Sequence, residues 1–171
     1  ISPTASQSTL LIDEANLNVT EYLALQKTNF LLKSLPTTWL INQRLQKSPS
    51  EIERINQACQ VTSQVVTKLI AEITAQSKVW LGQTELKITQ EIYSRLMNQN
   101  CPNLAFPTIV AFGENSAVPH HQPTHRKLKD NEVILIDCGA KFENYCADMT
   151  RTFWFGQQPS SKFKQVETVV K

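Results

Sequence analysis

The stretch DCGAKFENYCADMTRTFWFG, residues Asp137 to Gly156, decides the fold because it predicts a complete β-hairpin. It continues the apolar run at 132–137, which we expect to be a strand buried on both faces. Residues 144–155 alternate polar and apolar side chains, as a half-buried strand does. Asp137 and Asp148 lie near the ends of the two strands. The hairpin therefore places two like charges beside the most apolar run of the chain.

The register of this hairpin sets how close the two aspartates come. A two-residue turn at Phe142–Glu143 predicts that Asp137 lies directly opposite Asp148, whereas a bulge would shift the pairing by one residue. Directly opposed Cβ atoms are roughly 5 Å apart, and like charges there destabilise the pair. Protonation, an intervening basic side chain or a metal cation would relieve the repulsion. Two such carboxylates can bracket divalent ions ~3.5–4 Å apart. The alternative is structural, with one aspartate ending a strand and the other bonding a turn.

The two faces of the second strand differ in chemistry. Thr150 and Thr152 share the face of the aspartates, and their hydroxyls are suited to hold metal-binding carboxylates by hydrogen bonds. Met149, Phe153 and Phe155 lie on the other face, which suits a core. The alternation predicts a polar site above a buried layer.

All three histidines, His120, His121 and His125, lie in one polar loop before the hairpin. Two adjacent side chains of an extended segment point in opposite directions, so one of His120 and His121 can face a site while its neighbour faces away. The alternative is that these are surface histidines, which is the interpretation we adopt for His125.

The rest of the chain predicts an α+β order. Ser48, Pro49 and Glu51 have the residue types and spacing of a helix start. In chain order we expect a strand at 9–13, a helix over Glu21–Lys33 capped by Thr20, an ambiguous segment at 37–45, a long helix at 49–77, a helix at 85–99 capped by Thr84, a strand at 106–113, the hairpin, and a helix that includes residues 163–170. The long helix presents Ile52, Ile55, Cys59, Thr62, Val66, Leu69 and Ile73 on one face; the next presents Leu86, Ile92 or Tyr93, Leu96 and Met97.

Composition excludes several classes of partner. The net charge of +2 offers no electrostatic case for binding nucleic acid or a membrane, and no apolar run has the length of a membrane span. The four cysteines form no CxxC pair, so we expect reduced, mostly buried thiols and a cytoplasmic protein; a Cys138–Cys146 bridge is the alternative. The chain starts at Ile1 and stops inside a helical pattern, which predicts a piece of a longer protein.

Residues 106–156, with a PHH loop, a strand-borne Asp137, Asp148 eleven positions later and then TRT, resemble the central part of the M24 metallopeptidases. These have the pita-bread fold, and the resemblance is to their Xaa-Pro branch, aminopeptidase P and prolidase. The segment KSPSEIERINQA at 47–58 resembles the start of that catalytic domain. The resemblance implies the first half of the catalytic domain at 47–171, preceded at 1–46 by the tail of a creatinase-type N-terminal domain.

The same resemblance implies roles for individual residues. Asp137 and Asp148 match the first two of five ligands for two divalent ions, expected to be Mn²⁺, with Co²⁺ or Zn²⁺ as alternatives. His120 matches the loop histidine that contacts the substrate and the developing tetrahedral intermediate. The substrate would be a proline-containing peptide, and the complete protein would be a homodimer.

The match is incomplete. The family's other ligands are one histidine and two glutamates, yet no histidine follows His125 and Glu167 alone follows Asp148 among glutamates. Two aspartates bind divalent ions weakly, so we expect these 171 residues to be inactive unaided. The alternatives are a non-catalytic M24-fold module that binds proteins, a creatinase-type hydrolase, and a methionine aminopeptidase, against which the residues before Ser48 argue.

Overall fold

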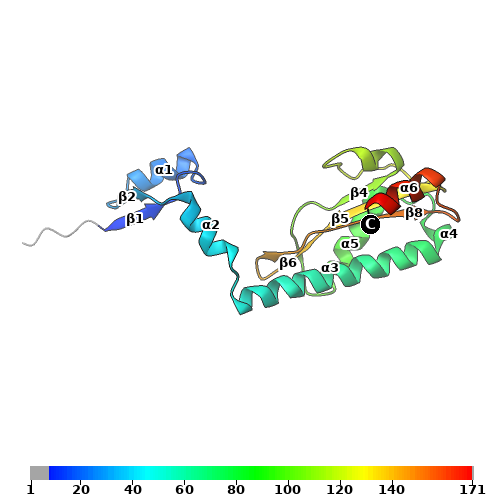
Figure 1. Ribbon diagram of the computed structural model, residues 1–171, viewed down its shortest axis with the longest axis horizontal. Coiled ribbons are helices and arrows are strands. Elements are labelled where there is room, and N and C mark those ends of the chain that lie inside the picture. Colours follow the sequence, from blue (N-terminus) through cyan, green and yellow to red (C-terminus); the bar gives the residue numbers. More distant parts are fainter. Residues whose placement is uncertain (1–7, 171) are drawn as a thin grey trace, which may run out of the picture. The chain divides into compact units, whose positions relative to one another are not determined.

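The computed structural model describes residues 8–170, and the expectation about the first residue lies outside this range. The chain divides into two compact units, Ile1–Ser48 and Pro49–Lys171, each described here by itself. Within the described range, no helix combines the length and the apolar character that crossing a membrane requires. Figure 1 labels the elements used below.

The first unit contains β1 (Thr9–Ile12), α1 (Val19–Gln26), β2 (Leu31–Ser34) and α2 (Thr37–Leu45), with β1 and β2 parallel. The expected helix over Glu21–Lys33 is wrong at both ends. The Asn18 side chain accepts a hydrogen bond from the Glu21 amide at 2.9 Å, and the Glu21 carboxylate accepts one from the Asn18 amide at 3.1 Å. This capping box starts the helix two residues before the expected position. Residues 31–34 pair with β1 instead of continuing the helix.

The second unit confirms the expected α+β order. It contains α3 (Pro49–Ala75), α4 (Ser77–Trp80), α5 (Glu85–Met97), β3 (Asn103–Leu104), β4 (Ile109–Phe112), the 3₁₀ helix η1 (Gly113–Ala117), β5 (Glu132–Cys138), β6 (Ala140–Phe142), β7 (Tyr145–Cys146), β8 (Met149–Phe155) and α6 (Ser161–Val170). The strands form two antiparallel sheets, in the orders β4-β5-β8 and β3-β6-β7.

Helices α3 and α5 pack against the strands, with α3 running along one side of them (Figure 1). As expected, Thr84 caps α5, accepting a hydrogen bond from the Lys87 amide at 3.1 Å. Parts of the expected apolar faces are exposed, namely Ile52, Cys59, Tyr93 and Met97. The buried layer is formed by Val65, Val66, Leu69, Ile73, Trp80, Ile88, Ile92, Leu96, Val110, Phe112, Leu128, Ile134, Ile136, Cys138, Ala140 and Phe155.

Strand β5 differs from the expectation that both of its faces are buried. Ile134, Ile136 and Cys138 are buried on the face toward the helices, whereas Leu135 and Asp137 on the other face are partly exposed. The four cysteines are free; Cys101 and Cys138 are buried, while Cys59 and Cys146 are exposed. The alternative of a Cys138–Cys146 bridge is therefore not realised.

The hairpin turn lies one residue later than expected. Glu143 and Asn144 have φ values of 43° and 70°, as the central residues of a type I′ turn require, and asparagine adopts this conformation readily. Asp137 consequently pairs with Thr150, and the expected direct pairing with Asp148 is wrong. When the turn shifts by one residue, the residue opposite each position changes by two. Each side chain therefore stays on the same face of the sheet. Asp148 stays on the face of Asp137, diagonally displaced along the strand.

Candidate metal centre

Three residues that the sequence singles out, His120, Asp137 and Asp148, line one pocket of about 310 Å³ in the second unit. They come from three places along the chain: the loop after η1, strand β5, and the segment between β7 and β8. The remaining lining residues are Phe106, Pro107, Ile109 and Gln122. Two acidic groups and an imidazole thus converge beside apolar side chains, an arrangement typical of ligand sites.

A break in the hairpin positions Asp148. Residues 147 and 148 belong to no strand, between β7 and β8, and Gly139 lies across from them between β5 and β6. A Cβ atom at Gly139 would overlap the carbonyl oxygen of Ala147, so the two backbones approach more closely here than any other residue would permit. The Ala147 amide donates to the Ala140 carbonyl at 2.9 Å, which fixes the chain just before Asp148.

One oxygen of the Asp137 carboxylate, Oδ1, is buried without a compensating hydrogen bond in the described part of the chain. Burial raises the pKa of Asp137, and the nearby charge of Asp148 raises it further, while Thr150 and His120 lower it. A cation at this position would satisfy the buried oxygen and neutralise the repulsion between the carboxylates.

The donor set present fits part of a metal site. Carboxylate oxygens suit divalent cations such as Mn²⁺, and the orphaned Oδ1 atom of Asp137 offers one such ligand. Across residues 8–170, however, no group of three or more His, Cys, Asp or Glu side chains could hold a metal ion. Asp137 and Asp148 would therefore contribute to a metal centre without completing it.

The two adjacent histidines face different surroundings. His120 lines the pocket and has a φ of 55°, in the left-handed region that few residues other than glycine occupy. The His121 ring lies with Nε2 3.0 Å from Oε2 of Glu85. His125 is exposed, as the sequence suggested. The loop therefore presents one imidazole to the pocket and holds its neighbour elsewhere.

The threonines of β8 lie on the face of Asp137. Thr150 pairs with Asp137, and Thr152 pairs with Leu135 two residues further from the pocket. Thr150 is therefore placed to support the carboxylate. Thr152 lies further along the strand, and neither threonine lines the pocket.

Sequence reasoning missed Glu85. It is completely buried at the first position of α5. Burial by itself raises the pKa of Glu85, but hydrogen bonds from four neighbouring residues outweigh burial and lower the pKa to about 2. An acidic residue in the first helical turn is the expected complement of the helix dipole, so the sequence carried no signal of a buried cluster.

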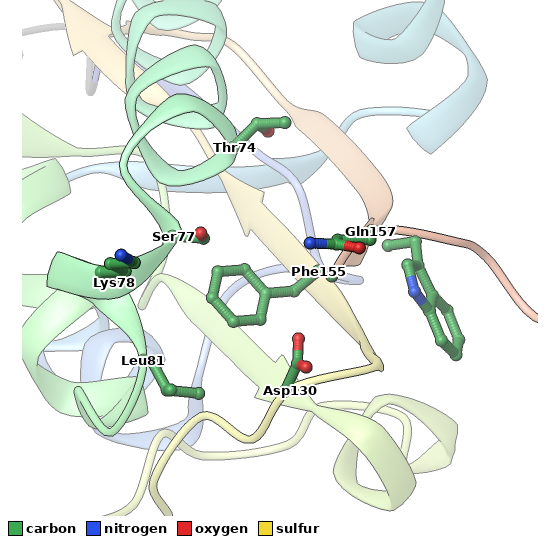
Figure 2. A pocket seen from close by; sticks show the side chains of 9 residues that line it. Thr74, Ser77, Lys78, Leu81, Asp130, Phe155 and Gln157 are labelled. Carbon is green, nitrogen blue, oxygen red and sulfur yellow. The ribbon is translucent and has the colours of Figure 1, made fainter.

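A second pocket, of about 320 Å³, lies at the opposite end of β8 and contains none of the predicted site residues (Figure 2). Lys78, Asp130 and Gln157 contribute polar groups to it, and Leu81 and Phe155 contribute apolar ones. Its lining residues include one carboxylate, that of Asp130, and no histidine, so this pocket lacks the paired carboxylates and the imidazole of the first pocket.

The chain resembles known proteins over most of its length. The model of a family described as Metallopeptidase family M24 matches residues 53–171. A Mycoplasma pneumoniae protein with the provisional name Xaa-Pro aminopeptidase is 35% identical over 145 residues, which cover 83% of this chain and 39% of that protein. An uncharacterized peptidase of Staphylococcus saprophyticus is 36% identical over 124 residues, covering 72% of this chain and 33% of the relative.

Solved structures show the same similarity. The X-Pro aminopeptidase of Thermotoga maritima superposes with a TM-score of 0.81 at 28% identity, covering 95% of this chain and 45% of that one. The Xaa-Pro dipeptidase of Bacillus anthracis superposes with a TM-score of 0.80 at 27% identity, covering 95% of this chain and 44% of that one. The chain thus spans less than half the length of the relatives and structures it matches.

Proposed function

Because this chain belongs to metallopeptidase family M24, we propose that it provides the first part of a dinuclear metal site for hydrolysis of Xaa-Pro peptide bonds. The observation that carries the proposal is the pocket in which Asp137, Asp148 and His120 meet, where one buried oxygen of Asp137 has no hydrogen-bond partner among the described residues. The expected pita-bread fold is confirmed by the similarity to the solved structures, of which the chain covers less than half.

In the proposed mechanism, Asp137 and Asp148 would hold the cations, and Thr150 would support Asp137 across the strand pair. A pair of divalent ions, Mn²⁺ with Co²⁺ or Zn²⁺ as alternatives, supplies Lewis acidity toward the scissile carbonyl when bound. His120 contacts the substrate and donates a hydrogen bond as negative charge develops on the carbonyl oxygen. Phe106, Pro107 and Ile109 line the same pocket and would pack against the peptide.

The number of ligands limits what these residues do alone. Two carboxylates leave most coordination positions of a divalent ion unfilled, so we propose weak binding by this chain and no turnover. The remaining His and Glu ligands would lie outside these 171 residues. The complete protein would be a cytoplasmic homodimer. Residues 1–46 would be the tail of a creatinase-type N-terminal domain, and residues 47–171 the first half of the catalytic domain.

Metal binding by the chain is the first test. Titration with Mn²⁺, followed by electron paramagnetic resonance, should show weak binding that Asp137→Asn and Asp148→Asn each abolish. Glu114→Gln is the control, because Glu114 is an exposed carboxylate in η1 that does not line the pocket. Binding that survives both aspartate substitutions would contradict the proposed ligands.

Activity is tested on the complete protein. With Mn²⁺ added, it should release an N-terminal residue from Xaa-Pro peptides and leave matched Xaa-Ala peptides intact. Cleavage of neither class would favour the non-catalytic module that binds proteins. Cleavage of N-terminal methionine, or of a guanidino compound, would favour the methionine aminopeptidase or creatinase alternatives.

A further inference from the structure

We infer that Glu85 is a positioning residue, which holds the loop of residues 113–128 so that His120 faces the pocket and His121 faces away. The importance of this position rests on the proposed function of His120, but the geometry that supports it does not depend on any activity. The carboxylate of Glu85 is completely buried, and its contacts reach both ends of the loop.

One oxygen of Glu85 fixes the start of the loop. Oε1 accepts hydrogen bonds from the Phe112 amide at 2.9 Å and from the Asn115 side-chain amide at 2.8 Å. Phe112 is the last residue of β4, and Asn115 lies in η1. The strand end and the first turn after it are therefore attached to the first residue of α5.

The other oxygen fixes the segment that carries the histidines. Oε2 accepts from the Thr124 amide at 2.9 Å and from the Thr124 hydroxyl at 2.8 Å, and the His121 ring nitrogen lies 3.0 Å away. Backbone bonds add to this attachment: the Glu85 amide donates to the Arg126 carbonyl, and the Leu86 amide donates to the Thr124 carbonyl. Glu85 thus joins the loop at both sides of His120.

The chemistry of the cluster requires an ionised carboxylate. Four of the five partner groups are N–H or O–H donors, and a carboxylate is the side chain that accepts at two oxygens without offering a proton. Facing an acceptor-only group, the His121 Nε2 atom must itself carry the proton. This bond orients the His121 ring toward Glu85. The left-handed backbone at His120 then directs the His120 side chain into the pocket.

The test is Glu85→Gln, which keeps the shape but replaces one acceptor by an N–H₂ group that faces donors. Long-range ¹H–¹⁵N spectra of the histidine rings, with nuclear Overhauser contacts, report the ring surroundings in the 171-residue chain without metal or substrate. We expect the His120 ring, which lines the pocket together with Ile109, to lose its pocket surroundings and its ring signals to shift. We also expect hydrogen exchange at the Thr124 amide to accelerate about tenfold or more, since its partly buried hydrogen bond to Glu85 is lost. The control Glu114→Gln, on the same loop, should leave the His120 ring signals and the Thr124 exchange rate unchanged.

Retention of the His120 ring signals and of Thr124 protection in folded Glu85→Gln would overturn the inference. If Glu85→Gln fails to fold, Thr124→Val tests the inference instead, because it removes the Thr124 hydroxyl donor and leaves the Glu85 carboxylate in place. Displaced His120 and His121 ring signals in Thr124→Val support the inference, and unchanged signals overturn it. Absence of Mn²⁺ binding by the unsubstituted chain would count against the proposed function alone.

Discussion

Asp137 on β5 lies directly opposite Thr150 on β8. Direct pairing puts their side chains on one face of the sheet, beside the pocket that Asp148 and His120 also line. Asp137 therefore meets a hydroxyl across the strand pair and a second carboxylate along the diagonal. Thr150 stabilises the ionised form of Asp137, whereas the charge of Asp148 destabilises it, and a substitution can remove either neighbour separately.

Substitution Thr150→Val should raise the pKa of Asp137 further. Burial and Asp148 raise that pKa, whereas Thr150 lowers it, so removing the hydroxyl removes an opposing effect. A raised carboxyl pKa means that the native state binds more protons than the unfolded state, so stability falls as pH rises from 3.8 through the native pKa. Carboxyl ¹³C titration measures the shift. The matched control, Thr152→Val, opposes Leu135 and should leave the pKa unchanged; equal shifts in both variants would contradict the assignment.

Substitution Gly139→Ala should cost about 3 kcal/mol or more in the free energy of unfolding, because the new methyl group overlaps the backbone of Ala147. Backbone atoms cannot step aside as a flexible side chain would. Gly82→Ala is the control: Gly82 has a φ of +80° but open space around it, so strain alone costs about 1–2 kcal/mol. Urea unfolding compares the two. An equal loss in both variants would show that the close approach to Ala147 is relaxed in solution.

Substitution Arg126→Met should destabilise the loop strongly. Arg126 bonds Glu132 at 2.7 and 2.9 Å and Glu114 at 3.0 Å, and only 14% of the arginine and 11% of the Glu132 side chain are exposed. Breaking a mostly buried pair leaves Glu132 with the hydrogen bond from the Lys129 amide but without its ion pair to Arg126, at a cost of about 3 kcal/mol. Arg54→Met is the control, since the Arg54–Glu143 pair is solvent-exposed and should matter much less. Thermal unfolding compares the stability lost in the two variants. A larger loss in Arg54→Met than in Arg126→Met would contradict the prediction.

Acid should weaken the contribution of Glu85 to stability. The pKa of Glu85 is lowered from 4.5 to about 2, so its contribution is full above pH 4.5 and is lost as the pH falls through the native pKa. That difference corresponds to about 3 kcal/mol at neutral pH. The stability gap between the unsubstituted chain and Glu85→Gln should therefore narrow between pH 4.5 and 2. A gap that stays constant over this range, measured by denaturant unfolding at each pH, would exclude the ionised carboxylate as its source.

Much of the fold could be predicted because it depends on local rules. The expected helix starts at Ser48 and Thr84 predict α3 and α5 to within two residues, and the Thr84 cap is confirmed. Helix α1 and strand β2 were mispredicted, because the capping box at Asn18 and the pairing with β1 outweighed a weak apolar periodicity. A local sequence pattern mispredicts an element where pairing with another strand or a competing helix cap determines the structure.

The candidate site divides in the same way. The sequence by itself determined that Asp137 and Asp148 share a face, because with any two-residue turn the alternation of side chains depends only on their spacing. The turn lies one residue later than the sequence predicts, so the predicted direct pairing of Asp137 with Asp148 is wrong, while their shared face is confirmed. Only the tertiary structure decided that His120 turns to the pocket and that Glu85 is buried beneath the loop. Those features depend on hydrogen bonds between residues 27 to 39 positions apart, which no local pattern encodes.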